Sequence, residues 1–134
     1  MKISSKGKYG LLLMLDLAMY DSGNYISLMD VSERTGVTQK YLEQIVSALS
    51  RAGLVRSQRG TRGGYRLAKD PEEITSGDIL RALEGPLHPG PEEGDPLQSY
   101  WDGFNQVIDQ YVDSITLAKL AASRQELVGN DYCI

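Results

Sequence analysis

The spacing of hydrophobic and polar positions over residues 1–85 predicts four short helices. The second helix begins with the S-x-x-D spacing of a capping box at Ser27 and ends at Gly36, where a left-handed residue can stop a helix. Thr38 can cap the third helix, which carries apolar residues at steps of three and four and runs to Ala52. Two helices separated by a short turn that contains glycine have the form of a helix-turn-helix.

A β-hairpin and a fourth helix follow the helix-turn-helix. Residues 54–58 and 65–68 alternate between apolar and polar side chains, as strands do, and a glycine-rich loop joins them. Thr75 and Asp78 have the spacing of another capping box, and a Gly-Pro pair ends the helix that they open. The pattern therefore predicts a mainly α fold with a small β-hairpin wing, that is, a winged helix-turn-helix DNA-binding domain over residues 1–85.

Beyond this unit, residues 86–96 (PLHPGPEEGDP) have the composition of a linker, and we expect little fixed structure in them. Over residues 97–127 we expect a long amphipathic helix and a short last helix, followed by a mobile tail over residues 128–134. The apolar face of the long helix could complete the core of one domain or pair two chains. We favour a homodimer, because the winged unit already has apolar faces of its own. The predicted dimerisation residues are Trp101, Phe104, Ile108, Tyr111 and Ile115.

The net charge of -4 conceals a division between the two halves of the chain. Residues 1–69 hold 11 Lys and Arg against 5 Asp and Glu, whereas residues 70–134 hold 3 against 13. Such an asymmetry favours a basic surface for a polyanion, joined to an acidic part with another task. Two solvated surfaces of opposite sign are the simpler alternative.

The composition also indicates in which compartment the protein is located. No stretch approaches the roughly 18 consecutive apolar residues of a membrane span, and the first residues lack the pattern of a signal peptide. The lone cysteine, Cys133, excludes an internal disulfide and a metal site built from several cysteines. We therefore expect a cytoplasmic protein that does not act at a membrane.

The third helix is apolar on one face and cationic on the other. The residues opposite its apolar face are Lys40, Gln44, Ser47 and Arg51. In a helix-turn-helix, the N-terminal residues of the second helix lie nearest the base edges of the major groove, so Lys40, Tyr41 and Gln44 are candidates for base contacts. Arg51, farther along, is expected to meet a phosphate. For this stripe alone, an ordinary solvated helix face is the alternative.

The hairpin loop SQRGTRGGYRLAKD is both positive and rich in glycine. A wing beside a recognition helix commonly reaches the adjacent minor groove, whose negative potential attracts arginine. Arg59 and Arg62 flank the predicted tip, and the glycines let backbone N–H groups approach phosphates closely. Because helix, wing and charge agree, the sequence predicts binding to double-stranded DNA.

Two other classes of function compete with DNA binding. Catalysis is not expected, because the only histidine, His88, lies in the linker and RGTRGGYR does not form the strand-to-helix turn of a nucleotide site. A winged helix used only to dock other proteins would not need cations on both the wing and the recognition helix. The charge pattern therefore favours a DNA-binding protein over an enzyme or a docking module.

These residues resemble the Rrf-two (IscR/NsrR/CymR) family of winged-helix transcription regulators. The matching segments are MKISSKGKYGLLLMLDLA, VTQKYLEQIVSALSRAGLV and RGTRGGYRLAKDPEEITSGDILRALEG, which cover nearly all of residues 1–85. The resemblance implies a homodimer on a palindromic operator, with Lys6 and Tyr9 near the phosphate backbone and Glu43 tuning base preference. Together with the contacts argued above, the predicted DNA-binding residues are Lys6, Tyr9, Thr38, Gln39, Lys40, Tyr41, Glu43, Gln44, Arg51, Arg59, Gly60, Thr61 and Arg62.

Many members of this family hold an iron–sulfur cluster on three cysteines just after the winged domain. This chain has PLHPGPEEGDPLQSYW there, without cysteine, so we expect no cluster, no other cofactor and no metal site. What remains resembles the cluster-free branch of cysteine-metabolism repressors (CymR), as LEGP at 83–86 and S-x-T-L-x-x-L-A at 114–121 indicate. The resemblance implies repression of sulfur and cysteine metabolism genes.

The last residues, NDYCI, resemble the tails of serine acetyltransferases, which insert a final isoleucine into O-acetylserine sulfhydrylase (cysteine synthase). By this resemblance, Asp131, Tyr132 and Ile134 would bind that enzyme, and the repressor would report sulfur supply through it. A frayed terminus is the plain alternative. Control by oxidation of Cys133 or by an unknown small effector is another, although no neighbouring cation activates this thiol.

Overall fold

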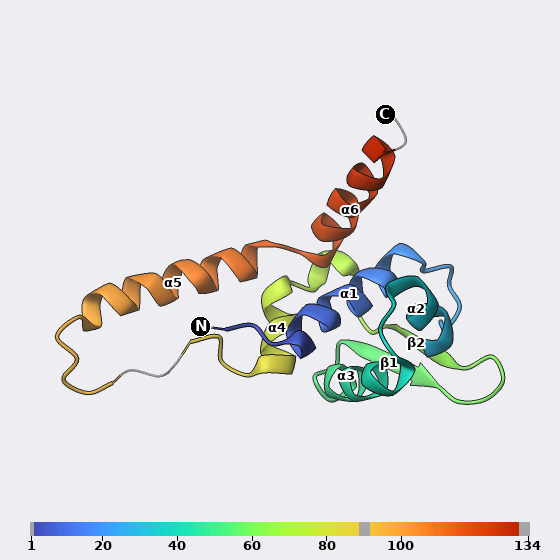
Figure 1. The fold of residues 1–134 in the computed structure, drawn as a ribbon, viewed down its shortest axis with the longest axis horizontal. Helices are drawn as coiled ribbons and strands as arrows, with labels where there is room; N and C mark the ends of the chain where they lie inside the picture. Colours follow the sequence, from blue (N-terminus) through green and yellow to red (C-terminus); the bar gives the residue numbers. More distant parts are fainter. Residues whose placement is uncertain (1, 89–91, 132–134) are drawn as a thin grey trace.

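The computed structural model describes residues 2–88 and 92–131 of the 134-residue chain. Its elements, in chain order, are α1 (Ser5–Met19), α2 (Leu28–Thr35), α3 (Gln39–Arg51), β1 (Val55–Gln58), β2 (Gly64–Leu67), the 3-10 turn η1 (Pro71–Glu73), α4 (Ser76–Glu84), α5 (Gln98–Ser114) and α6 (Leu117–Asp131). Helices α1 to α4 and the hairpin form one body, from which α5 and α6 extend in different directions (Figure 1). The predicted mainly α fold with a β-hairpin wing is confirmed.

The core of the winged unit lies where α1, α3 and α4 meet. Its fully buried side chains include Leu13, Leu17, Leu42, Ile45, Leu49, Ile74, Ile79 and Leu117. Full burial of each such side chain stabilises the fold by about 1.5–3 kcal/mol. Helix α1 approaches α4 closely at Gly10, where an added Cβ would lie 1.9 Å from Leu83 Cδ1, so any larger residue there would displace the buried Leu83 side chain.

Local capping chemistry fixes the helix ends of the DNA-binding unit much as predicted. The hydroxyl of Ser27 accepts from the Asp30 N–H, and Gly36 ends α2 at φ 79° in the left-handed region. Thr38 caps α3 by accepting from the Tyr41 N–H at 3.2 Å. At α4, Thr75 and Asp78 form the reciprocal capping box. These bonds satisfy backbone donors that the first turn of a helix leaves unpaired.

The first helix obtains its cap from a distant residue. The Glu84 carboxylate at the end of α4 accepts from the backbone N–H groups of Ser4 and Gly7, each at 3.0 Å. A carboxylate near a helix N-terminus also complements the helix dipole. Glu84 therefore joins the start of α1 to the end of α4.

The wing is a two-stranded antiparallel hairpin whose second strand also pairs with a third segment. Val55 pairs with Leu67 and Gln58 with Gly64. Ile26, in the connection between α1 and α2, exchanges backbone hydrogen bonds with Tyr65 at 2.8 and 3.0 Å. The wing is thus tied to the first half of the helix-turn-helix.

The C-terminal third is more firmly attached than its composition indicates. The prediction of little fixed structure over residues 86–96 is wrong for its first part, because Leu87 is only 5% exposed and His88 contacts Asp109 at 3.0 Å. The long helix spans Gln98–Ser114, close to the prediction. The last helix begins at the buried Leu117 and runs to Asp131, beyond the predicted end at 127 and into the predicted tail.

Candidate nucleic-acid interface

Helix α3 presents the predicted polar stripe to solvent. Leu42, Ile45 and Leu49 are fully buried on its inner side. The opposite side chains, all exposed, are Lys40, Gln44, Ser47 and Arg51. Glu43 is also exposed beside this stripe. The helix therefore offers cations and an amide at the surface while its apolar face fixes its orientation.

Helix α1 supports the start of α3 through two aromatic rings. Tyr9 and Tyr41 meet edge to face, with ring centroids 5.8 Å apart and an interplanar angle of 89°. Edge-to-face aromatic pairs are favourable beyond the area that they bury. Tyr41 is half-buried, and Tyr9 is 39% exposed. The half-buried Lys6 lies one turn before Tyr9 on α1.

The wing loop exposes all four of its predicted contact residues. These are Arg59, Gly60, Thr61 and Arg62. Gly60 adopts φ 109°, and its carbonyl accepts from the Gly63 N–H at 3.0 Å, which closes the turn. Only glycine tolerates such a φ without strain. The turn thereby sets the two arginines on either side of the tip.

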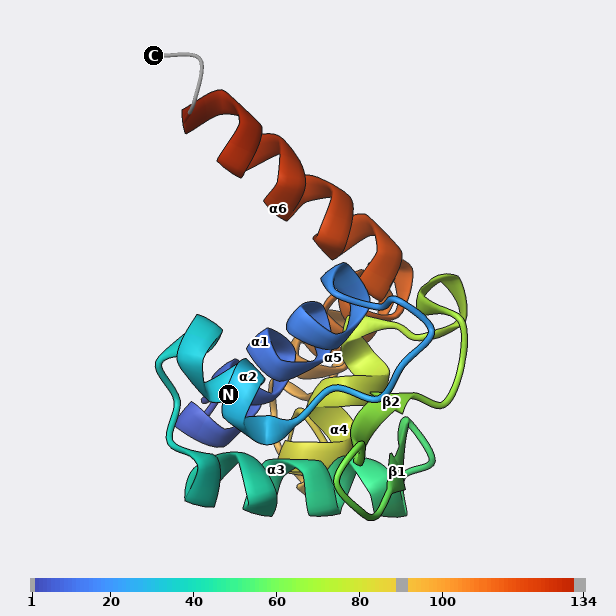
Figure 2. The same ribbon diagram turned by 90° about the vertical axis from the view of Figure 1, so that its right-hand side faces the viewer.

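The recognition helix and the wing lie along the same edge of the molecule. In Figures 1 and 2, which differ by a quarter turn, α3 forms the lower edge and the loop between β1 and β2 extends from that edge. A duplex placed against α3 would therefore meet the wing loop as well. This is the arrangement in which a helix in the major groove and arginine in the minor groove act together.

A partly buried ion pair that the sequence analysis missed joins α2 of the helix-turn-helix to α1. Asp16 on α1, 6% exposed, accepts two hydrogen bonds from Arg34 at the end of α2, at 2.8 and 2.9 Å. These hydrogen bonds raise the pKa of Arg34 above its ordinary value. The Arg34 guanidinium also lies 4.1 Å from the centroid of the Tyr20 ring. Arg34 follows the apolar run LLLMLDLAMY by too many residues for the pairing to be read from spacing.

The predicted dimerisation face is only partly free within one chain. The exposed large side chains of α5 include Tyr100, Trp101, Phe104, Val107 and Tyr111, the last at 66% exposure. Ile108 instead packs against the small cluster of Leu80, Leu87 and Val112. Ile115 lies past the end of α5, and its carbonyl accepts from the Ser76 N–H at 2.7 Å.

The predicted enzyme-binding tail falls largely outside the described residues. Asp131 is the last residue of α6, and only its backbone is described. Tyr132, Cys133 and Ile134 lie outside the described part of the chain. The tail therefore stays a prediction from the sequence.

The chain also lacks suitable ligands for the iron–sulfur cluster that many family members hold. Its single cysteine is Cys133, so three thiolates cannot converge in one chain. Over residues 2–88 and 92–131, no group of three or more His, Cys, Asp or Glu side chains is arranged to hold a metal ion. The donor set does not fit a cluster, and we assign it no role. In the same residues, no helix is long and apolar enough to cross a membrane.

Comparison with known proteins gives close relatives over the whole fold. Residues 3–123 match the Rrf2 family, described as an iron-dependent transcriptional regulator. The chain is 42% identical over 125 residues to the transcriptional regulator CymR of Bacillus subtilis, with 91% of each chain covered. It is 36% identical over 140 residues to the regulator IscR of Serratia proteamaculans, covering 98% of this chain and 85% of the relative.

Solved structures are similar as well. That of CymR, the global cysteine regulator of B. subtilis, matches with a TM-score of 0.83 at 40% identity, covering 92% of this chain and 98% of the other. The oxidized form of Staphylococcus aureus CymR matches with a TM-score of 0.76 at 43% identity, covering 90% and 96%. The relatives are named as transcriptional regulators, which are not enzymes.

Proposed function

The chain belongs to the Rrf2 family of DNA-binding, winged-helix transcriptional regulators, as the sequence predicted, and we propose that it acts as a homodimer on a palindromic operator. Lys40, Tyr41 and Gln44 contact base edges in the major groove, and Arg59 enters the minor groove. Glu43 tunes base preference, and the remaining predicted residues contact phosphates or position these side chains. The exposed face of α5 pairs the two chains, because isologous contact of one apolar face with its copy gives a closed dimer.

The observation that carries this proposal is the shared edge of α3 and the wing, on which Lys40, Arg51, Arg59 and Arg62 are all exposed. Cations on a recognition helix and on its wing neutralise phosphates on adjacent parts of a duplex. A winged helix that docks only proteins has no need of this arrangement.

A mobility-shift assay with genomic fragments tests the interface. The double variant Lys40→Ala/Arg59→Ala should lose specific complexes while keeping the mass of the dimer. The matched control, Lys119→Ala/Arg124→Ala, removes the same charge from exposed positions of α6. Equal loss of binding in both double variants would mean that net charge, and not this surface, drives the interaction.

We also propose that the regulated genes serve sulfur and cysteine metabolism and that regulation is repression in the cytoplasm. The similarity to CymR supports the gene class. Transcript profiling after deletion should show cysteine and sulfur genes rising. Unchanged sulfur transcripts with changes elsewhere would reassign the regulator to other genes.

Control through O-acetylserine sulfhydrylase completes the proposal. The end of α6 lies on the side of the molecule opposite α3 in both views, so an enzyme bound at the tail would leave the DNA-binding edge uncovered. A terminal carboxylate beside an apolar side chain is readily captured by a pocket. Asp131, Tyr132 and Ile134 make the contact.

Extending the chain by one residue after Ile134 tests this control. The extension should abolish binding to purified O-acetylserine sulfhydrylase, whereas the same residue added before Met1 should not. A Cys133→Ser variant tests the rival control by thiol oxidation, since it should respond to sulfur supply as the wild type does. Unaltered enzyme binding after the C-terminal extension would discard the docking of the tail.

A further inference from the structure

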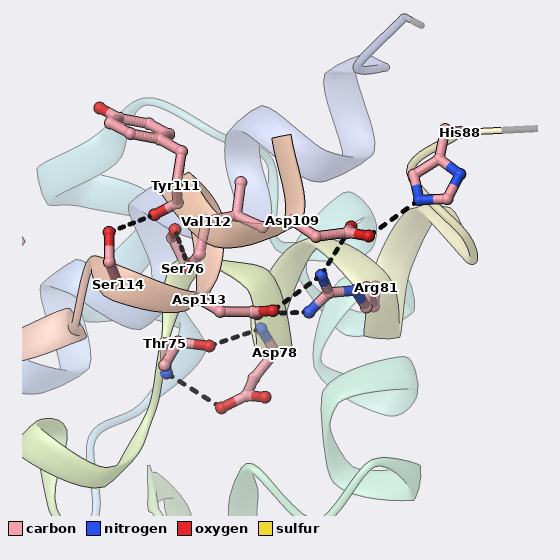
Figure 3. Close-up of polar contacts among 10 residues, drawn as sticks. All are labelled: Thr75, Ser76, Asp78, Arg81, His88, Asp109, Tyr111, Val112, Asp113 and Ser114. Carbon is pink, nitrogen blue, oxygen red and sulfur yellow. Dashed lines mark hydrogen bonds and ion pairs between the residues drawn. The ribbon is translucent and has the colours of Figure 1, made fainter. Parts of the chain in front are cut away.

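A polar cluster that takes no part in DNA binding fastens the C-terminal half of α5 to the winged unit. Arg81 on α4 donates to Asp113 at 2.5 Å and to Asp109 at 3.0 Å, and these two acids lie one turn apart on α5. His88, just past α4, contacts the other oxygen of Asp109 at 3.0 Å (Figure 3). We name these four residues the α4–α5 clamp.

The clamp sets one guanidinium between two carboxylates. Hydrogen bonding to Asp113 raises the pKa of Arg81 above its ordinary value. The hydrogen bonds from His88 and then Arg81 lower the pKa of Asp109. Arg81 also donates to the second oxygen of Asp113 at 3.2 Å, so its planar guanidinium meets both oxygens of one carboxylate. Such a bidentate contact fixes orientation as well as distance, which an ammonium cannot do.

Backbone contacts hold the same junction at the end of α5. The Ser76 hydroxyl donates to the Val112 carbonyl at 2.9 Å, and the Ser76 N–H donates to the Ile115 carbonyl at 2.7 Å (Figure 3 shows the first). The Leu117 N–H in turn donates to the Ile74 carbonyl at 2.8 Å. The junction is therefore held along α5 from Asp109 to its end.

The N-terminal half of α5, by contrast, extends away from the winged unit (Figure 1). Tyr100, Trp101 and Phe104 are all exposed there. At 1.5 Å per residue, the start of α5 lies about 17–22 Å from the clamp residues Asp109 and Asp113, so a tilt of about 10° at the clamp moves the far end by about 3–4 Å. That displacement is similar to the rise of one base pair, about 3.4 Å.

We propose that the α4–α5 clamp, with Arg81 as its positioning residue, holds the two recognition helices of the dimer at one separation and so selects operators by the spacing of their half-sites. The inference rests on the proposed homodimer through α5. It adds that the angle between α4 and α5 is fixed by side chains, and that this angle determines which half-site spacing the dimer accepts.

Spin labels test the clamp without DNA. In the full chain with Cys133→Ser, a label at Ser50→Cys, exposed near the end of α3, reports the distance between the two recognition helices by double electron–electron resonance. The wild-type clamp should give one narrow distribution. Arg81→Leu should broaden it by about twofold or more, and Arg81→Lys should also broaden it, because the bidentate contact is lost in both.

Arg66→Leu is the matched control, because the Arg66 side chain is 28% exposed against 34% for Arg81 and its ion pair with Asp21 lies within the winged unit. Its distribution should stay narrow. If Arg81→Leu does not fold, the width of the Arg81→Lys distance distribution tests the proposal instead. An unchanged width in a folded, dimeric Arg81 variant, or a broad distribution in the wild type, would overturn the proposal.

Operator spacing gives the functional readout. On a duplex selected from random DNA by the wild-type protein, one base pair inserted or deleted at the centre should weaken wild-type binding about tenfold and binding of the Arg81 variant about threefold or less. Binding to an isolated half-site should be equal in both. Equal spacing preference would overturn the inference, whereas failure of the wild type to bind any duplex would instead refute the proposed function.

Discussion

At the scale of the residue, Gln44 is the side chain that we propose reads a base most directly. Its amide is exposed in the middle of the α3 stripe, where it can donate to and accept from one adenine. Gln44→Ala should therefore weaken operator binding by about 1–3 kcal/mol and relax the preference at one base pair in each half-site. Anisotropy titrations against single-base operator variants measure both effects. Uniform weakening at every variant would place Gln44 on the phosphate backbone instead.

The Asp16–Arg34 ion pair is a single contact that should contribute measurably to the free energy of unfolding. Arg34→Leu should destabilise the fold by about 2–4 kcal/mol in urea unfolding, because it leaves the Asp16 carboxylate buried and unpaired. Asp21→Leu, which breaks the exposed pair with Arg66, should cost less than about 1 kcal/mol. If the two variants lost equal stability, the burial of Asp16 would not be the cause.

The polar stripe was predictable at this scale because helical periodicity alone separates its residues from the buried face. Asp16 was not predictable. A charged residue within an apolar run gives no sign of its partner, and Arg34 belongs to another helix. The α4–α5 clamp escaped the sequence analysis for the same reason, since Arg81 and Asp109 meet only after the chain has passed through the linker.

At the scale of elements, the wing depends on its attachment to the connection between α1 and α2. A Cβ at Gly64 would lie 2.2 Å from the Ile26 carbonyl oxygen, and Gly64 has φ 154°. Gly64→Ala should therefore separate β2 from Ile26, with a stability loss of about 1–3 kcal/mol and weaker DNA binding. Gly103→Ala, at an open helical position of α5, should instead stabilise the fold slightly. Urea unfolding of both variants checks this, and a stable Gly64→Ala protein with full DNA affinity would contradict it.

The positions of several helix ends could be predicted because their capping residues are close by in the sequence. Thr38 and Thr75 each accept from a backbone N–H three residues on, so both caps could be read directly. The start of α1 could not, because its cap is Glu84 from another element. The linker prediction failed at Leu87, which packs against Leu80 of α4 and Val112 of α5. Proline and glycine content indicates the local backbone preference, but it does not show that two distant helices provide an apolar surface.

At the scale of the whole molecule, the division of charge has a measurable consequence. The basic residues of the first half include the exposed cations of α3 and the wing loop, and the acidic residues of the second half include Asp109 and Asp113 of the clamp. If the dimer neutralises roughly six to ten phosphates, raising the salt concentration from about 50 to about 200 mM should weaken DNA binding by about 10³–10⁵. A DNA affinity that hardly changed over this range of salt concentration would show that the exposed cations of α3 and the wing do not contact the duplex.

Affinity cleavage tests most directly the central claim that α3 and the wing bind DNA along one edge of the molecule. An iron chelate attached to Thr61→Cys, at the exposed wing tip of a Cys133→Ser protein, should cleave the operator in the minor groove beside each half-site, symmetrically about its centre. The same chelate at Ser123→Cys, exposed on α6, should not cleave above background. Absence of cleavage from the wing, or equal cleavage from α6, would contradict the account.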